Sequence, residues 1–282
     1  MAKLIATDLD GTLFYPKHTI RMVSNRTVRA IRRFIDNGNK FAIVSGRSFE
    51  SCMTVIHRIK RDVIIVGCNG AFIMENKKTI YSVSFKEGDL LPVMKFMEEN
   101  FDIRGVLLMN TDKAYKNVDS FKTKKYKFGY LTYMFFQGAY RENFHKSKMS
   151  YQELLESGKV HKLLVMFGLN QDARRRAHEA SIIMNEKFGD ILECAWSGLV
   201  VEITPKGCTK AEGLKFVEEY YNINHNDVYV VGDSGNDISM FNAYYENSFC
   251  MKKAPLSVSK HAKHIVSRAR DVVAYIENEE RK

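Results

Sequence analysis

The sequence lacks paired cysteines and any apolar run long enough to cross a membrane. Its five cysteines are scattered and form no C-x-x-C pair, which argues against a disulfide framework or a zinc site and favours a reducing compartment. No apolar stretch approaches the roughly 18 residues that a transmembrane helix needs. The first residues show no signal-peptide pattern. We therefore expect a cytoplasmic protein.

Low-complexity linkers and internal repeats are also absent, and the basic residues are not gathered into one patch. The formal net charge is +10, but the excess is spread along the chain. A dispersed positive charge attracts any anion, phosphorylated metabolites included. We therefore expect no nucleic acid and no membrane as partners, and we expect a monomer or a weak homodimer.

The sequence does contain an alternation of short apolar runs and amphipathic segments. Leu4–Ala6, Phe41–Val44 and Val63–Val66 are predicted strands. A helix is predicted from Ser24, its N-cap, to Asn37. Continuous apolar runs that alternate with helices are typical of a parallel sheet covered on both faces. The predicted fold class is α/β.

The pattern changes near residue 84 and returns near the end of the chain. Residues 84–195 mix helical with strand-like stretches, and Tyr126–Tyr140 is rich in aromatic residues, which favours core or inter-domain packing over a cofactor site. The first pattern is predicted to resume at Leu199–Ile203. We expect a discontinuous α/β core with a Rossmann-like parallel sheet, residues 1–83 and 196–282, and an inserted α+β cap domain, residues 84–195.

Two aspartates follow the first predicted strand, in the sequence Asp8-Leu9-Asp10-Gly11-Thr12. Ligands of open α/β sheets bind at the carboxyl ends of the strands. Two carboxylates in that position are usually reconciled by a hard cation such as Mg²⁺, and then one can act as a nucleophile and the other as an acid/base. Aspartates at strand ends also cap turns, so this motif alone leaves both interpretations open.

Further polar groups are predicted at strand ends or helix starts. Ser45 follows a strand, and Lys210 opens a helix. Asp233, Asn236 and Asp237 follow a later strand. Singly, each has an ordinary explanation: a helix-capping serine, a solvated lysine, a polar turn. Together, a hydroxyl, an ammonium and two carboxylate sites at one sheet edge complement a phosphoryl group with its metal.

These motifs, in this order, resemble the haloacid dehalogenase superfamily. Ile43–Arg47, Pro205–Lys210 and Gly232–Met240 are similar to the motifs of its Cof-type phosphatases, and the resemblance covers the whole chain. The interval between Ser45 and Lys210 holds the place of the large α+β cap of that branch. The resemblance implies that the cap sets substrate specificity.

The resemblance also implies a role for each motif residue. Asp8 would attack phosphorus and form an aspartyl-phosphate, and Asp10 would protonate the leaving alcohol and then deprotonate water. Mg²⁺, the implied cofactor, would be held by Asp8, by Asp10 through its backbone carbonyl and by Asp233, with Asp237 behind them. Thr12 would hold the loop and orient Asp10. The phosphate-binding residues would be Leu9, Thr12, Ser45, Gly46, Lys210 and Asn236.

One stretch departs from the Cof-type pattern. These proteins commonly carry Met-Gly-Asn-Ala after the last motif, and the corresponding stretch here is Met251-Lys252-Lys253-Ala254. The departure leaves the predicted catalytic groups unchanged. It weakens any transfer of substrate preference from relatives.

The leading hypothesis is a Mg²⁺-dependent phosphomonoesterase, a phosphatase for small phosphorylated metabolites, sugar phosphates first among them. Phosphoryl transfer to a second alcohol, as in phosphomutases, shares the first steps. A catalytically quiet regulatory binding protein on the same fold is the third alternative, and retention of Asp8, Asp10 and Lys210 argues against it.

A Walker-type ATPase is disfavoured because no G-x-x-x-x-G-K-[ST] motif occurs. A cysteine-dependent phosphatase is disfavoured because Cys52 and Cys208 have ordinary core or helix-start explanations.

Overall fold

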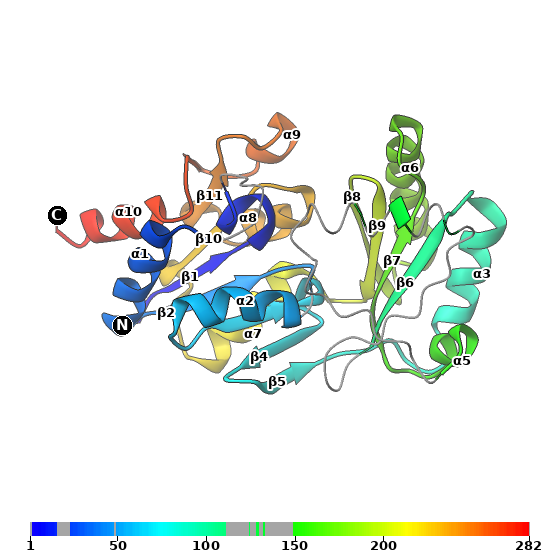
Figure 1. Ribbon diagram of the computed structural model, residues 1–282, viewed down its shortest axis with the longest axis horizontal. Coiled ribbons are helices and arrows are strands. Elements are labelled where there is room, and N and C mark those ends of the chain that lie inside the picture. Colours follow the sequence, from blue (N-terminus) through cyan, green and yellow to red (C-terminus); the bar gives the residue numbers. More distant parts are fainter. Residues whose placement is uncertain are drawn as a thin grey trace. The chain divides into compact units, whose positions relative to one another are not determined.

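The chain divides into two compact units in a computed structural model (Figure 1). One unit is Met1–Tyr81 with Lys210–Lys282, and the other is Ser82–Thr209. The structure describes residues 2–15, 23–47, 49–110 and 149–281, together with Lys124, Phe128, Gly129 and Thr132.

The first unit is built on an eight-stranded sheet in the order β12-β11-β10-β1-β2-β3-β4-β5. Neighbouring strands from β12 to β3 are parallel, and β4 is antiparallel to β3. This confirms the predicted α/β class with a parallel core. The strands are β1 (Leu4–Thr7), β2 (Lys40–Val44), β3 (Ile64–Gly67), β4 (Phe72–Glu75), β5 (Lys78–Ser82), β10 (Val228–Gly232), β11 (Ser248–Met251) and β12 (His264–Val266).

Helices cover this sheet, and their ends follow from local chemistry. The predicted N-cap of the first helix, Ser24, accepts a hydrogen bond from the backbone N–H of Thr27 at 3.2 Å. That helix ends at Asp36, and Gly38, two residues later, has a φ of +85°, which favours glycine. The helices of the unit are α1 (Asn25–Asp36), α2 (Phe49–Ile59), α7 (Lys210–Tyr220), α8 (Ile238–Ala243), α9 (Leu256–Ser259) and α10 (Asp271–Glu279).

The central strands are buried between helices. Leu4 and Ala6 of β1 pack in one cluster with Leu214 of α7 and Phe241 of α8. Burial of a side chain of this size contributes about 1.5–3 kcal/mol relative to exposure. The packing fixes the register of β1 against β2 and β10, and therefore fixes where the chain leaves the sheet.

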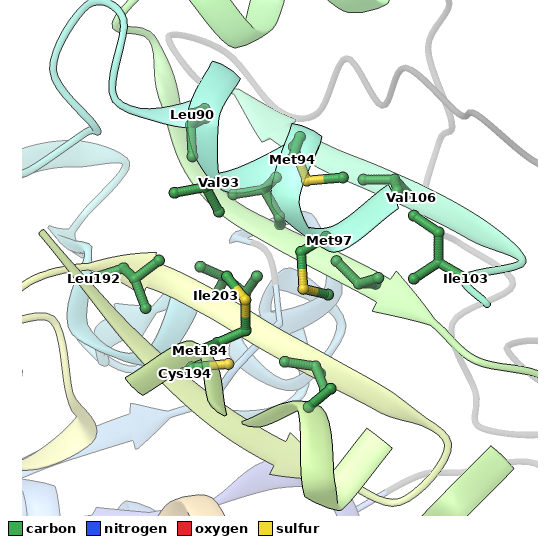
Figure 2. Packing of buried hydrophobic residues seen from close by; sticks show 14 of the residues in the cluster. Leu90, Val93, Met94, Met97, Ile103, Val106, Met184, Leu192, Cys194 and Ile203 are labelled. Carbon is green, nitrogen blue, oxygen red and sulfur yellow. The ribbon is translucent and has the colours of Figure 1, made fainter. Parts of the chain in front are cut away.

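The second unit has its own antiparallel sheet, in the order β6-β7-β9-β8, and its own core. Figure 2 shows part of that core, where Val93 and Met97 of α3 lie among side chains from the strands. The elements are β6 (Gly105–Asn110), β7 (Val160–Met166), β8 (Leu192–Ser197), β9 (Val200–Pro205), α3 (Leu90–Asn100), α5 (Tyr151–Glu156) and α6 (Gln171–Phe188).

The inserted unit extends farther along the chain than residues 84–195. The run Leu199–Ile203, expected to resume the core, falls mainly in β9, and Ile203 lies opposite Leu163 of β7 and Cys194 of β8. A short apolar run has the same sequence pattern whether its strand belongs to the parallel core or to the sheet of the insertion. Periodicity alone therefore could not decide which sheet Leu199–Ile203 joins.

The sequence also predicted packing of the aromatic segment and no membrane-spanning helix. Tyr126–Tyr140 lies outside the described residues except for three positions, of which Phe128 is 73% exposed. Across the ranges that the structure describes, no helix has both the length and the apolar character that crossing a membrane demands.

Candidate active site

The candidate site lies in the first unit, at the edge where β1, β2 and β10 end. Asp8, Ser45 and Asp233 directly follow these three strands. The backbone N–H of Asp8 donates to Val231 of β10 at 2.8 Å, and that of Ser45 donates to Val66 of β3 at 2.8 Å. Sheet pairing therefore continues into the site and holds the first residue of each loop.

The loop after β1 bends at Gly11, which has a φ of +78°. A Cβ atom at this position would lie 2.3 Å from Oδ2 of Asp233, so glycine is required both by conformation and by space. Thr12 donates its hydroxyl to Oδ1 of Asp233 at 2.8 Å. Thr12 was expected to help hold the loop and to orient Asp10. Its hydroxyl ties this loop to the loop after β10, and its role toward Asp10 stays a prediction.

Lys210, the first residue of α7, carries its ammonium group into the buried centre of the site. Its Nζ donates to Oδ1 of Asp8 and to Oδ1 of Asp237, each at 2.7 Å, and its side chain is fully buried. Burial alone would lower the pKa of Lys210, but the carboxylates of Asp237 and Asp8 outweigh it and raise the pKa above its usual range. Lys210 therefore holds its positive charge.

Asp8 is 4% exposed and keeps one oxygen outside this ion pair. Its Oδ2 has no hydrogen-bond partner among the described residues. Burial raises the pKa of Asp8 well above its ordinary value, and the nearby Lys210 opposes that rise. A buried carboxylate oxygen without a partner costs free energy, which is typical of a group that meets a ligand.

Both carboxylate oxygens of Asp237 accept hydrogen bonds from groups of the protein. Its Oδ2 accepts hydrogen bonds from the backbone N–H groups of Asp233 and Ser234, both at 2.9 Å, while its Oδ1 faces Lys210. Gly232 makes room for it, because a Cβ atom there would lie 2.4 Å from Cγ of Asp237. Asp237 thus shapes the loop that presents Asp233.

Three carboxylates converge at the centre. One oxygen from each of Asp8, Asp233 and Asp237 lies within 4.8 Å of the others. Burial raises the pKa of Asp233, as it does that of Asp8. Clustered carboxylate oxygens with one buried atom unpartnered fit a hard divalent cation such as Mg²⁺. Both oxygens of Asp237 accept hydrogen bonds at 2.9 Å or less, whereas Oδ2 of Asp233 has a contact of 3.2 Å with Lys253, so Asp8 and Asp233 are the better ligands.

Asp10 points to a different partner. The guanidinium of Arg47 donates to both of its oxygens, through Nη2 to Oδ1 at 2.8 Å and through Nε to Oδ2. Arg47 also donates its backbone N–H to the hydroxyl of Ser45 at 3.1 Å. The Asp10 side chain is therefore held by the loop after β2, and only its backbone could join Asp8 and Asp233 at a cation.

Residues 5–276 match the sequence model of the haloacid dehalogenase-like hydrolases. The chain belongs to this family. The match spans both segments of the first unit and the whole insertion, which confirms the predicted family and enzyme class, a phosphatase.

Curated relatives and solved structures agree with this family. A 5-amino-6-(5-phospho-D-ribitylamino)uracil phosphatase of Bacillus subtilis is 26% identical over 246 residues, 84% of this chain and 82% of its own. The Escherichia coli phosphatase of the same name is 23% identical over 266 residues, 93% and 89% of the two chains. A sugar phosphatase structure, BT4131, has a TM-score of 0.76 at 18% identity and covers 99% of each chain. At that identity it shows the fold alone.

The structure describes the surroundings of three further residues that were predicted to bind phosphate, Asn236, Leu9 and Ser45. Asn236 accepts a hydrogen bond from the Ser234 hydroxyl at 2.7 Å through its Oδ1. Leu9 is fully buried, backbone included. Ser45 is buried beside them at the strand edge. Their roles in this haloacid dehalogenase-like hydrolase remain predictions.

Sequence reasoning missed Arg47 and Lys253. Arg47 stands in the Ser-Gly-Arg stretch that carried the resemblance but received no role, and only its contact with Asp10 reveals one. Lys253 stands in the stretch that departs from the Cof-type pattern, and its Nζ lies 3.2 Å from Oδ2 of Asp233. The departure from the family pattern was the available signal.

Cys52 and Arg58 have the C-x5-R spacing of cysteine-dependent phosphatases. In this hydrolase both residues lie within the helix α2, and Cys52 is fully buried. Arg58 donates to Asn25 at 2.7 Å through Nη2. The pair therefore forms no phosphate-binding loop.

Proposed function

We propose that this protein is a Mg²⁺-dependent phosphomonoesterase that forms an aspartyl-phosphate on Asp8. The observation that carries the proposal is the buried carboxylate of Asp8, with one oxygen fixed by Lys210 and the other unpartnered. Such an oxygen can be used by a cation or a reacting phosphorus. A structural capping aspartate would have both oxygens satisfied, as Asp237 does.

The cation would be held by Asp8, by Asp233 and by the backbone carbonyl of Asp10. When bound, it supplies positive charge that offsets the repulsion between a carboxylate and a phosphate dianion. The remaining positive charge comes from Lys210, which stays ionised at the same place.

The phosphoryl group would be bound by Lys210, by the Ser45 hydroxyl and by the backbone N–H groups of Leu9 and Gly46, with Asn236 at the rim. These donors come from rigid elements, since Lys210 begins α7 and Ser45 directly follows β2. Fixed donors aimed at developing negative charge lower the barrier without reorganisation.

Asp10 would act as the acid and base. Arg47 holds its carboxylate through two hydrogen bonds to the loop after β2, which orients a side chain only two residues along the chain from Asp8. In the first step Asp10, protonated and released from Arg47, would give that proton to the leaving alcohol. In the second step it takes a proton from the water that attacks the aspartyl-phosphate.

The substrate class would be small phosphorylated metabolites with several hydroxyl groups, sugar phosphates foremost. Two relatives are named as phosphatases of a compound with a phosphorylated ribityl chain, and one structural neighbour is titled a sugar phosphatase. The inserted unit, Ser82–Thr209, would supply the contacts that select among them. In capped enzymes a closing domain provides specificity and excludes water.

The test is phosphate release from a panel of phosphorylated metabolites, with MgCl₂ or with EDTA. We expect release with MgCl₂ and none with EDTA. With a hexose phosphate, free phosphate supports hydrolysis, whereas an isomerised hexose phosphate would favour a phosphomutase. Absence of both products across the panel would favour a regulatory binding protein.

We also propose that the protein is cytoplasmic and acts as a monomer or weak homodimer. The dispersed positive charge and the isolated cysteines support this proposal. Light scattering coupled to size exclusion tests the oligomeric state, and a stable tetramer would contradict it.

A further inference from the structure

Lys253 lies beside Asp233, one of the three clustered carboxylates. Its Nζ is 3.2 Å from Oδ2 of Asp233, and its side chain is 26% exposed. The same Nζ lies 4.8 Å from the ring centroid of Tyr15, and the guanidinium carbon of Arg268 lies 4.8 Å from that ring as well. Lys253 is thus held by one carboxylate and one aromatic ring, with part of its length open to solvent.

Sheet register explains why this lysine reaches Asp233. β11 runs parallel to β10, with Cys250 opposite Gly232. The chain that leaves β11 therefore emerges beside the chain that leaves β10, and Lys253 arrives next to Asp233. The resemblance to Cof-type proteins places an asparagine at this position, so the ammonium is a departure from that pattern.

The ammonium of Lys253 also faces the reacting loop. A Cβ atom at Gly11 would lie 2.7 Å from Nζ of Lys253 and 2.3 Å from Oδ2 of Asp233. Both charged groups therefore lie against the bend between Asp10 and Thr12. Both Lys252 and Lys253 are exposed residues, but the ammonium of Lys253 reaches Asp233, whereas Lys252 hydrogen-bonds Val266 through its backbone N–H.

The two lysines of the site, Lys210 and Lys253, differ in burial and in the length of their contacts with carboxylates. Lys210 is fully buried between two carboxylates at 2.7 Å, so its charge is fixed there. Lys253 has one carboxylate contact, at 3.2 Å, and a cation–π contact with Tyr15, and its side chain is 26% exposed. A divalent cation and an ammonium group compete for the same oxygen of Asp233, since each needs that negative charge.

We propose that Lys253 is a substrate-binding residue that occupies Asp233 in the metal-free protein and turns to the phosphoryl group when the cation takes that carboxylate. The proposal rests on the proposed function, because it needs the cation at Asp8 and Asp233. In the metal-free state Lys253 offsets repulsion among the carboxylates. In the loaded state it adds one positive charge toward a phosphate dianion.

Two binding measurements without turnover test this proposal. Mg²⁺ is titrated into the metal-free protein by calorimetry, and inorganic phosphate is then titrated into protein saturated with Mg²⁺. For Lys253→Met we expect Mg²⁺ to bind about two- to five-fold more tightly, because its competitor is gone. We expect inorganic phosphate to bind about ten-fold more weakly, because a charged donor is lost. Lys253→Asn should behave in the same way, and Lys252→Met should match the wild type.

The opposite direction of the two changes is the signature of the proposal. A variant that merely disturbs the fold would weaken both ligands, and that result would overturn it. Unchanged Mg²⁺ and phosphate affinities in both Lys253 variants would also overturn it, as would equal effects in Lys252→Met. If the wild-type protein binds no Mg²⁺, the metal site of the proposed function fails and this inference with it. Mg²⁺ binding that the Lys253 variants leave unchanged overturns the inference alone.

Discussion

At the scale of single residues, the site is a balance of charges around one buried carboxylate. Lys210 neutralises Asp8 and Asp237 together, and Thr12 and Lys253 share Asp233. Each acidic group therefore has a positive or hydrogen-bonding neighbour except at Oδ2 of Asp8, for which the described residues provide none. Chemistry is expected at that atom.

Replacing this carboxylate tests its role. Asp8→Asn keeps the size of the side chain and removes the nucleophile, so we expect phosphate release to fall by at least about 10⁴-fold. The measurement is turnover of p-nitrophenyl phosphate with MgCl₂, with circular dichroism to establish folding. A folded variant that retains a tenth of the wild-type rate would exclude Asp8 as the nucleophile.

Gly11 offers a second test at this scale, with a matched control. Alanine at Gly11 must adopt a φ of +78° and place its Cβ 2.3 Å from Asp233. Alanine at Gly38 meets a similar φ, +85°, with nothing within 4 Å of its Cβ. We expect each variant to lose about 1–2 kcal/mol of unfolding free energy through conformation. Only Gly11→Ala should also lose Mg²⁺ binding and activity.

Calorimetric Mg²⁺ titration and denaturant unfolding separate the two effects. If Gly11→Ala binds Mg²⁺ as the wild type does, the close contact with Asp233 does not shape the site.

At the scale of elements, the antiparallel sheet of the inserted unit contains a buried ion pair. Lys162 of β7 donates to Glu202 of β9 at 2.6 Å, and their side chains are 1% and 10% exposed. Charges removed from water require a partner, and loss of one leaves the other uncompensated. The pair therefore ties two neighbouring strands together.

We expect Lys162→Met to destabilise the inserted unit by about 3–5 kcal/mol, because the buried Glu202 loses the ammonium group of Lys162. The double variant Lys162→Met with Glu202→Leu should recover much of that loss. The only tryptophan of the chain, Trp196, lies on β8 of the same sheet, so its fluorescence reports unfolding of this unit.

Arg175 provides the control for this pair. It contacts Asp172 and Glu179 on the surface of α6, where water screens the charges. Arg175→Met should leave the unfolding midpoint close to that of the wild type. An equal loss in Arg175→Met and Lys162→Met would show that burial of the pair is not what matters.

At the scale of the whole molecule, ligand binding should appear as stability. Carboxylates held close together repel one another, and a cation that binds only the folded protein shifts the unfolding equilibrium. At a Mg²⁺ concentration about 100 times its Kd, the gain is about 2.7 kcal/mol. Thermal unfolding with MgCl₂ or EDTA measures it, and Asp233→Asn should lose most of it. A gain of the same size in that variant would place the cation elsewhere.

The sequence was sufficient for the α/β class, for the parallel core and for the residues at the strand ends. Asp8, Ser45 and Asp233 each follow a buried apolar run, and this local pattern survives folding. The roles of Arg47 and Lys253 could not be predicted, because they depend on register between distant strands. Nothing in the local pattern separates Lys253 from Lys252. Likewise, the apolar run of β9 contains no sequence signal that indicates which of the two sheets it joins.

The central claim is a double displacement through a protein carboxylate, and stereochemistry at phosphorus tests it most directly. The substrate is a phosphorothioate monoester made chiral with two oxygen isotopes, and the acceptor is water that carries the third isotope, so that the product thiophosphate is chiral as well. Two in-line displacements, first by Asp8 and then by the acceptor, each invert phosphorus. The account therefore predicts overall retention of configuration, and overall inversion would contradict it.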